Sequence, residues 1–545
     1  MVSLWLHNFL LLRTPGKRFV LCLVTVSHPL CYDCVMDMSA HSSPDRHGSH
    51  SQPDHRPIGG NTGYGASHSV GASSPQTVRP GDIVFESYAQ AIEYLNAHAN
   101  LERTKPSRAQ RDIMSLDRIA AILHEMGDPQ QTLRFAHIAG SKGKGSTTEM
   151  LASIMRGCGY SVGQYMSPHL VSVRERIRLG GPTKDGASDA WISEDALRVA
   201  LGSAGAAAER ASARHGPATY FELLTAAAIR YFADEQPDLV VLETGMGGRL
   251  DATSAMTPEV CGITSIQLEH QQVLGHSLQE IAAEKAGIFK PGVAAFSVEQ
   301  APAVAEVLRS AAARIGAPLQ ILGEDIEFSE RIEHDSKRGT HARLSLSTGG
   351  IACEHMTVPL LGEHQAQNCA LAIAMSAELA RRGMPISVEG VAIGLASTPR
   401  NGRCEVVSKS PTVIVDGAHN PESVQALMRA VAAHFKYGSM VVVFGCASDK
   451  DIGGMLHRLA QGADKVIFTR ASDNPRAAAP AELERRFKEI SQTMCQSDPD
   501  VSSALKRARE AVAADDLICV TGSFYVAGEA KSLILSGGVR RESVR

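Results

Sequence analysis

A glycine-rich stretch carries the residues whose types and spacing most clearly imply chemistry. Gly140-Ser-Lys-Gly-Lys-Gly-Ser146 follows the short apolar segment Phe135–Ala139 and precedes a helical run, Thr147–Arg156. A strand, a glycine turn and a helix start form a setting in which backbone N–H groups hold phosphate. Lys144 would reach the terminal phosphates, and the closing serine hydroxyl could meet a magnesium ion. The spacing is not a strict Walker A, because Ile138 stands where that motif has glycine; the alternative is a flexible turn with solvated lysines.

Polar residues also follow three further apolar segments. Met166–Leu170 follows the apolar segment Ser161–Tyr165, Glu243–Thr253 follows Leu239–Leu242, and Gln267–His270 follows Cys261–Ile266. Ligands of open α/β sheets bind beyond the carboxyl ends of the strands, so we expect these residues beside the glycine loop. Magnesium bound with a nucleotide takes a few carboxylate or hydroxyl oxygens and several waters, which makes Glu243 a candidate ligand. The alternative for a single strand-end glutamate is a helix cap or a surface charge.

Two other stretches place titratable side chains at the ends of elements. Glu284–Pro291 puts Lys285 at the end of a helix, where its simplest role is a favourable interaction with the helix dipole. In Val413–Pro421 an apolar strand is followed by a turn and a new helix. Asp416 and His419 emerge there, either facing the first half of the chain across a cleft or capping that helix.

The elements that position these residues alternate between short apolar strands and helical runs, which indicates a parallel sheet covered on both faces. Phe328–Pro359 instead has the pattern of antiparallel strands, and Ala366–Arg382 returns to helix. A second alternation follows Thr398–Gly402, with strands at Thr412–Val415, Met440–Phe444, Lys465–Phe468 and Leu517–Thr521. The predicted fold class is α/β: a P-loop-containing, mostly parallel ATPase domain over residues 82–397 and a smaller doubly wound, Rossmann-like domain over residues 398–545.

Composition and charge limit the classes of function. The chain has 545 residues, a formal net charge of −4 and no basic stripe with interleaved aromatics, so nucleic-acid binding is not expected as its main activity. Its 11 cysteines are odd in number and irregularly spaced, which favours a reducing compartment over a disulfide framework. No apolar run is long enough to span a bilayer, and we expect a cytoplasmic protein.

Residues 1–81 are interpreted as a leader that precedes the ordered domains. Ser39–Pro80 is rich in His, Ser, Gly and Pro and poor in large apolar residues, so we expect it to be disordered. Phe19–Val26 resembles the short core of a signal peptide, but no Ala-x-Ala site follows it. We favour a start at Met36 or Met38, or a disordered leader, over secretion.

Nine short motifs follow one another along most of the chain. Each is weak evidence by itself, but their combination and order are specific. They are His137–Ser146, Ser167–Leu170, Thr219–Glu222, Glu243–Thr253, Glu269-His270 with Val273–Gly275, Glu284–Ile288, Leu361–Asn368, Gly402–Glu405 and Asp416–Pro421. With them, the chain from about Asp82 to Leu535 resembles the dihydrofolate synthase/folylpolyglutamate synthase family, within the Mur ligase superfamily.

The resemblance implies an ATP-dependent amide ligase that adds L-glutamate to dihydropteroate, to the γ-carboxylate of reduced folates, or to both. ATP would convert a substrate carboxylate into an acyl phosphate, and the glutamate amine would then displace phosphate. ATP and Mg²⁺ are the implied cofactors, with K⁺ as a further candidate. The expected partners are these small molecules, with no nucleic acid and no membrane, and the chain is expected to be a monomer.

The resemblance also implies roles for individual residues. Lys144, Lys285 and His270 would be catalytic, Lys285 in a carbamylated form, and magnesium would be held by Ser167, Glu243 and His270. ATP would be bound by Ser141, Lys142, Gly143, Lys144, Gly145, Ser146, Asn368, Arg403, Asp416 and His419. The pterin site would be lined by Thr219, Tyr220, Phe221, Glu222, Leu250, Asp251 and Ala252, with Met114–Asp117 as a further segment.

Two places depart from the family's usual motifs. Ser141-Lys142 replaces Thr-Asn in the loop, which adds positive charge beside the phosphates, and Glu269 stands where Asp usually precedes the histidine. Neither removes an implied ligand, so an active enzyme is expected. One alternative is a Mur-type peptidoglycan ligase, but Ser39–Pro80 leaves little room for the N-terminal sugar-nucleotide domain of that class. The other alternative is a non-catalytic nucleotide-binding regulator.

Overall fold

A computed structural model describes residues 10–12, 20–22, 77–104, 114–182, 190–335, 339–472 and 474–537. The chain divides into two units, Met1–Ser67 and His68–Arg545. In the first unit, β1 (Leu10–Leu12) and β2 (Val20–Cys22) form an antiparallel pair. Most of the proposed leader, including Met36, Met38 and nearly all of Ser39–Pro80, lies outside the described residues.

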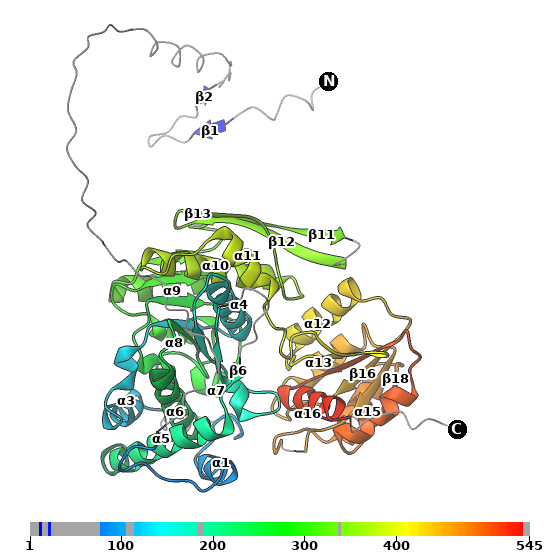
Figure 1. The fold of residues 1–545 in the computed structure, drawn as a ribbon. Coiled ribbons are helices and arrows are strands. Elements are labelled where there is room, and N and C mark those ends of the chain that lie inside the picture. Colours follow the sequence, from blue (N-terminus) through cyan, green and yellow to red (C-terminus); the bar gives the residue numbers. More distant parts are fainter. Residues whose placement is uncertain are drawn as a thin grey trace, which may run out of the picture. The chain divides into compact units, whose positions relative to one another are not determined.

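The largest sheet of the second unit, called here the central sheet, has eight strands. They are β3 (Phe135–Ala139), β4 (Val162–Tyr165), β5 (Ile177–Gly180), β6 (Ala190–Trp191), β7 (Leu239–Glu243), β8 (Val260–Ile263), β9 (Ala294–Ser297) and β10 (Leu319–Ile321). Their order is β10-β9-β8-β3-β7-β4-β5-β6 (Figure 1). The strands from β10 to β4 run parallel, while β5 and β6 are antiparallel additions at one edge. The prediction of a mostly parallel sheet is therefore confirmed.

Helices cover both faces of the central sheet. They are α1 (Tyr88–Asn96), α3 (Leu116–Glu125), α4 (Lys144–Gly157), α5 (Glu194–His215), α6 (Tyr220–Glu235), α7 (Gln271–Leu274), α8 (Leu278–Lys285), α9 (Pro302–Ile315), α10 (His364–Arg381) and α11 (Val388–Ala396). Along β7, Val240 and Leu242 pack with α3, α5 and α6, whereas Leu239 and Val241 pack with α4 and α10. Because successive side chains of a strand point to opposite faces, burial of both faces requires the unbroken apolar run seen in the sequence.

A small antiparallel sheet lies beyond α10. It consists of β11 (Phe328–Asp335), β12 (Gly339–Thr348) and β13 (Ile351–Thr357), as the pattern of residues 328–359 predicts. Leu344, Leu346 and Cys353 of this small sheet join the apolar core formed with α4 and α10.

A six-stranded sheet, called here the C-terminal sheet, completes the second unit. Its strands are β14 (Glu405–Lys409), β15 (Thr412–Val415), β16 (Met440–Phe444), β17 (Lys465–Phe468), β18 (Met494–Ser497) and β19 (Leu517–Thr521), in the order β14-β15-β19-β16-β17-β18. The helices around it are α12 (Pro421–His434), α13 (Ile452–Leu459), α14 (Pro480–Ile490), α15 (Val501–Glu510) and α16 (Phe524–Leu535). Only β14 is antiparallel to its neighbour. The division of the domains at residue 398 stays a prediction.

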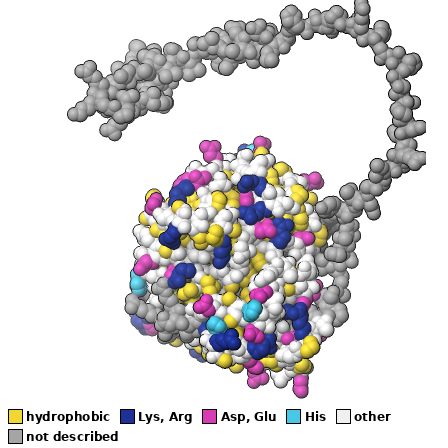
Figure 2. All heavy atoms as spheres, turned by 90° about the vertical axis from the view of Figure 1, so that its left-hand side faces the viewer, with side chains coloured by type: hydrophobic (Ala, Val, Ile, Leu, Met, Phe, Trp, Pro, Cys, Tyr) yellow, Lys and Arg dark blue, Asp and Glu magenta, His cyan; other side chains and the backbone are white. Residues whose placement is uncertain are grey.

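The surface shows two further features. Within the described ranges, none of the helices is both long and apolar enough to cross a membrane. On the face drawn in Figure 2, acidic and basic side chains are interspersed.

Candidate active site

The glycine loop connects the end of β3 to the start of α4. The N–H groups of Ser141 and Lys142 both donate to the carbonyl oxygen of Ser265, at 2.9 and 3.1 Å, which ties the loop to the segment after β8. Gly140 has φ +150°, and a Cβ there would lie 1.8 Å from Oγ1 of Thr264. Gly143, the N-cap of α4, has φ +95°. The loop therefore needs glycine at both positions, because one is too crowded and the other lies in the left-handed region.

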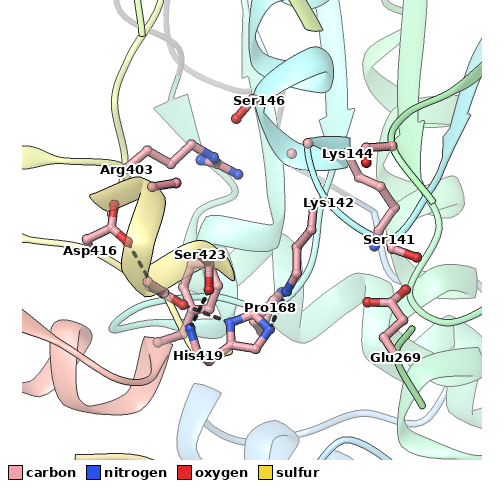
Figure 3. Close-up of a pocket in the computed structure, with 18 of the residues that line it drawn as sticks. Ser141, Lys142, Lys144, Ser146, Pro168, Glu269, Arg403, Asp416, His419 and Ser423 are labelled. Atoms are coloured by element: carbon pink, nitrogen blue, oxygen red, sulfur yellow. Dashed lines mark hydrogen bonds between the residues drawn. The ribbon is translucent and has the colours of Figure 1, made fainter. Parts of the chain in front are cut away.

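The start of α4 fits a phosphate group. Gly143 caps it without a side-chain hydrogen bond, and the first turn holds no acidic residue, so its N–H groups can receive an anion. Nζ of Lys144 folds back to 2.9 Å from the carbonyl oxygen of Gly140. Arg403 lies over the same turn, since a Cβ on Gly145 would be 2.0 Å from its Nη2. A helix N-terminus and two cationic side chains therefore meet at this end of the cavity (Figure 3).

Lys285 lies beneath the loop, with only 1% of its side chain exposed. Its Nζ donates to the carbonyl oxygen of Gly140 at 2.7 Å and to Oε1 of Glu269 at 2.8 Å. Burial lowers the pKa of Lys285, and the neighbouring Lys144 acts in the same direction. Burial would raise the pKa of Glu269, but Lys285 and Lys144 outweigh it and hold that pKa well below its ordinary value. Lys285 therefore ends α8, as predicted, but its buried amine also supports the glycine loop, which the helix-dipole interpretation did not include.

Ser167, Glu243 and His270, the predicted metal ligands, line the same cavity. The backbone N–H of Ser167 donates to Oε2 of Glu243 at 3.3 Å. Burial raises the pKa of Glu243, opposed by Lys144 and Arg403. Burial lowers the pKa of His270 to about 4, which keeps its imidazole neutral, as a metal ligand must be. The described residues hold no group of three or more His, Cys, Asp and Glu side chains placed to bind a metal.

The C-terminal sheet contributes Arg403, Asp416 and His419 to the opposite wall. Oδ2 of Asp416 accepts the N–H of Cys404, and Oδ1 accepts the N–H of Ala418, both at 2.8 Å. Cys404 has φ 49°, in the left-handed region, and directly follows Arg403. Asp416 thus holds the turn that carries Arg403, and burial raises the pKa of this carboxyl to about 6.

The structure brings most of the predicted site residues around one cavity of about 820 Å³. Two predicted site residues, Lys285 and Tyr220, do not line this cavity. Lys285 lies beneath the loop. Tyr220 is buried, and its ring lies 5.7 Å from the guanidinium carbon of Arg176. Asn368 approaches the loop, because a Cβ on Gly143 would lie 2.3 Å from its Oδ1.

The predicted pterin residues at this cavity also hold the local backbone. Thr219 is the N-cap of α6 and forms a capping box with Glu222. Asp251 caps a short helical turn, Ala252–Ala255, and accepts hydrogen bonds from the N–H of Met246 and the N–H and hydroxyl of Thr253. The carboxylates of Glu222 and Asp251 therefore hold the backbone of the cavity wall in place, in addition to any contact with a ligand.

Arg118 and Glu222 form a buried ion pair behind this wall, with Nε 2.8 Å from Oε2. We expect Arg118→Met to lower the free energy of unfolding of this region by about 3 kcal/mol, because it leaves a buried carboxylate without its cation. Urea unfolding followed by circular dichroism measures this loss. Adding Glu222→Gln should recover much of it, while Arg210→Met, which breaks an exposed pair with Glu125, should cost less than about 1 kcal/mol. Equal losses in the two single variants would contradict the prediction.

Lys450 and Arg476 are cavity residues that the sequence interpretation missed. They follow β16 and β17, at the carboxyl ends of parallel strands of the C-terminal sheet. Nη1 of Arg476 donates to the backbone carbonyl of Glu102 at 2.8 Å, across the cavity. The strand-end rule, extended to these two strands, would have found both residues.

The two α/β sheets, the glycine loop between β3 and α4 and the charged cavity match a known class of protein. Residues 190–376 match the family described as Mur ligase middle domain, and residues 402–524 match the Mur ligase, glutamate ligase domain. The chain is thus built as a Mur ligase, a class of ATP-dependent ligases.

Individual relatives narrow the class. A dihydrofolate synthase/folylpolyglutamate synthase of Bacillus subtilis is 33% identical, over 75% of this chain and 92% of that protein. A probable bifunctional folylpolyglutamate synthase/dihydropteroate synthase of Haloferax volcanii is 34% identical over 76% of this chain, which spans only 48% of that relative. The chain belongs to the dihydrofolate synthase/folylpolyglutamate synthase family.

Solved structures agree with this assignment. Mycobacterium tuberculosis folylpolyglutamate synthase, complexed with ADP and AMPPCP, superposes with a TM-score of 0.71 at 30% identity, covering 82% of this chain and 98% of that one. Escherichia coli FolC, in complex with DHPP and ADP, superposes with a TM-score of 0.70 at 30% identity, covering 83% and 99%. The prediction of the family is confirmed.

Proposed function

We propose that this enzyme joins L-glutamate to dihydropteroate, to the γ-carboxylate of reduced folates, or to both. The observation that carries the proposal is the continuity of one cavity. The glycine loop and a partly apolar wall that includes Met114, Phe221 and Leu250 both line it. A flat, partly apolar pterin fits such a wall. The folate-ligase names of the relatives above support the same substrates and favour them over peptidoglycan precursors.

The arrangement suits transfer of a phosphoryl group to a carboxylate. The N-terminus of α4, Lys144 and Arg403 would hold the phosphates of ATP and neutralise charge as it develops. The substrate carboxylate then attacks the γ-phosphate, ADP leaves, and an acyl phosphate remains. The neutral amine of glutamate attacks the acyl carbon, the C–O bond to phosphate breaks, and an amide and inorganic phosphate are released. The residues act by alignment and by charge.

Magnesium fits the donor groups present near the loop. Glu243 supplies a carboxylate that is 4% exposed, and Ser167 and His270 add a hydroxyl and a neutral imidazole. When bound, Mg²⁺ would neutralise phosphate charge. A small protein donor set is usual for Mg²⁺ bound with a nucleotide, because phosphate oxygens and water complete its shell. A role for K⁺ stays a prediction.

The assay uses the full-length chain with ATP, magnesium and glutamate, and either dihydropteroate or a reduced folate as the second substrate. We expect glutamate-dependent ADP release, with a product heavier than the pterin substrate by one glutamyl residue in mass spectrometry. Omission of glutamate, or chelation of magnesium, should abolish it. Tight ATP binding without product for either pterin would contradict the proposal and favour the non-catalytic regulator.

We further propose that the enzyme acts as a monomer in a reducing compartment, the cytoplasm. Residues from both large sheets of the same chain line the cavity described above, and the eight cysteines from Cys158 to Cys519 are free thiols. Light scattering during gel filtration tests the first point, and the location of the tagged full-length chain in cells tests the second.

A further inference from the structure

Lys142 reaches across the cavity toward the C-terminal sheet. Its Nζ lies 2.9 Å from Nε2 of His419, and Nδ1 of the same ring lies 2.8 Å from the carbonyl oxygen of Gly417 (Figure 3). A carbonyl oxygen can only accept a hydrogen bond, so Nδ1 carries the proton and the lone pair of Nε2 faces Lys142. The ammonium of Lys142 therefore donates to a neutral imidazole.

Both partners of this contact are held by their own surroundings. The N–H of Lys142 donates to the carbonyl oxygen of Ser265 at 3.1 Å, beside the matching bond from Ser141. The N–H of His419 donates to Oγ of Ser423 in the first turn of α12 at 3.1 Å, and its ring lies 6.2 Å from that of Phe524. The contact thus joins two anchored turns, one on each large sheet.

The surrounding charges explain why Lys142 takes a neutral partner. The charged groups that face the pair are Lys144 of the loop, Glu269 of the segment before α7, Glu422 of α12 and Lys450 of the segment before α13. The Glu269 carboxylate is already paired with Lys285 at 2.8 Å. Burial lowers the pKa of Lys142 to about 8, with Lys144 and Lys450 acting in the same direction. The lone pair on Nε2 of His419 accepts a hydrogen bond from Lys142, so that no second buried carboxylate is needed beside this lysine.

We propose that Lys142 is a positioning residue, which holds His419 and the turn before α12 against the phosphate loop before substrates bind. The two walls of the cavity, one with the loop and one from the C-terminal sheet, are then aligned in advance. Alignment made beforehand lowers the entropic cost of bringing reactants together. The kinetic consequence rests on the proposed function, whereas the contact itself does not.

Histidine NMR of the full-length chain tests the contact without any substrate. The His419 signal is assigned by its loss in His419→Ala and then titrated in the wild type and in Lys142→Met. The neighbouring Lys142, together with burial, holds the pKa of His419 well below its ordinary value. Lys142→Met should therefore raise the His419 pKa toward that value, whereas Lys488→Met, on the exposed side of α14, should leave it unchanged. An identical His419 pKa in Lys142→Met and the wild type would overturn the proposal.

A kinetic double-mutant cycle tests the positioning role. Lys142→Met should lower kcat/KM for glutamate about tenfold in the wild-type background, but less than about twofold when His419 is already alanine. A tenfold loss in both backgrounds would show that Lys142 acts on a ligand by itself and would overturn the positioning role. A wild-type chain without glutamate-dependent turnover contradicts the proposed function instead, and the NMR comparison then decides whether the contact exists.

Discussion

Replacing Lys144 by alanine is expected to lower kcat for glutamate-dependent ADP release about a thousandfold. Lys144 opens α4, and its Nζ lies 2.9 Å from the carbonyl oxygen of Gly140. The cation is thus held at the glycine loop, beside the N-terminus of α4. Its loss removes charge neutralisation from phosphoryl transfer, where charge stabilisation provides most of the catalysis. Steady-state assays at saturating ATP and glutamate measure the effect.

The control for Lys144→Ala must separate catalysis from folding. Its thermal unfolding should match that of the wild type, since Lys144 is only half-buried and forms no ion pair within the described residues. Lys506→Ala removes the same charge from the exposed side of α15 and should keep full turnover. Activity of Lys144→Ala close to that of the wild type would mean that the loop is misassigned.

Replacing Lys285 by alanine is expected to reduce kcat by at least about a hundredfold. The Lys285 amine is buried against the carbonyl oxygen of Gly140 and the Glu269 carboxylate, so its removal loosens the loop from below. Because burial lowers the pKa of Lys285, more of the amine is neutral, and only the neutral amine can attack CO₂ to form a carbamate. The structure is therefore compatible with the carbamylated form implied by the family.

Short carboxylic acids distinguish the two states of Lys285. If the carbamate is needed, acetate or formate should restore part of the turnover of Lys285→Ala, by supplying a carboxylate in the space left by the side chain. Added methylamine would restore it instead if the ammonium is the working form. A variant that responds only to methylamine would contradict the carbamate. Glu269→Gln provides the matched control, since it keeps Lys285 and removes its negatively charged partner.

The repeating apolar strands of this chain were predictable because their surroundings are uniform. The bounds predicted for β15, β16, β17 and β19 coincide with those in the structure. All five residues of β16 and of β19 are buried, so burial on both faces leaves an unbroken apolar run. The edge strands β14 and β18 were missed for the opposite reason. Their side chains are partly exposed, and they lack the run that marks a buried strand.

Residue roles were harder to predict than residue locations. Asp416 was expected to contact ATP, yet both of its carboxylate oxygens accept backbone N–H groups of the turn that carries Arg403. Its contact with ATP stays a prediction. Glu222 likewise lines the cavity, but its Oε2 already accepts hydrogen bonds from the N–H of Thr219, the N-cap of α6, and from Nε of Arg118. Which lone pairs remain for a ligand depends on neighbours that lie far away in sequence.

The sequence by itself determined the alternation of strands and helices, the glycine loop between β3 and α4, and the family. These features depend on local spacing and on the two-sided burial of strands, both of which are written along the chain. Only the tertiary structure decided that Lys285 supports Gly140 from below and that Lys142 meets His419 across the cavity. Each contact joins segments more than a hundred residues apart. Which groups each lysine contacts depends on burial and on which neighbouring charges already have a partner. The glycine loop could therefore be located from sequence, but the contacts of Lys142 and Lys285 could not.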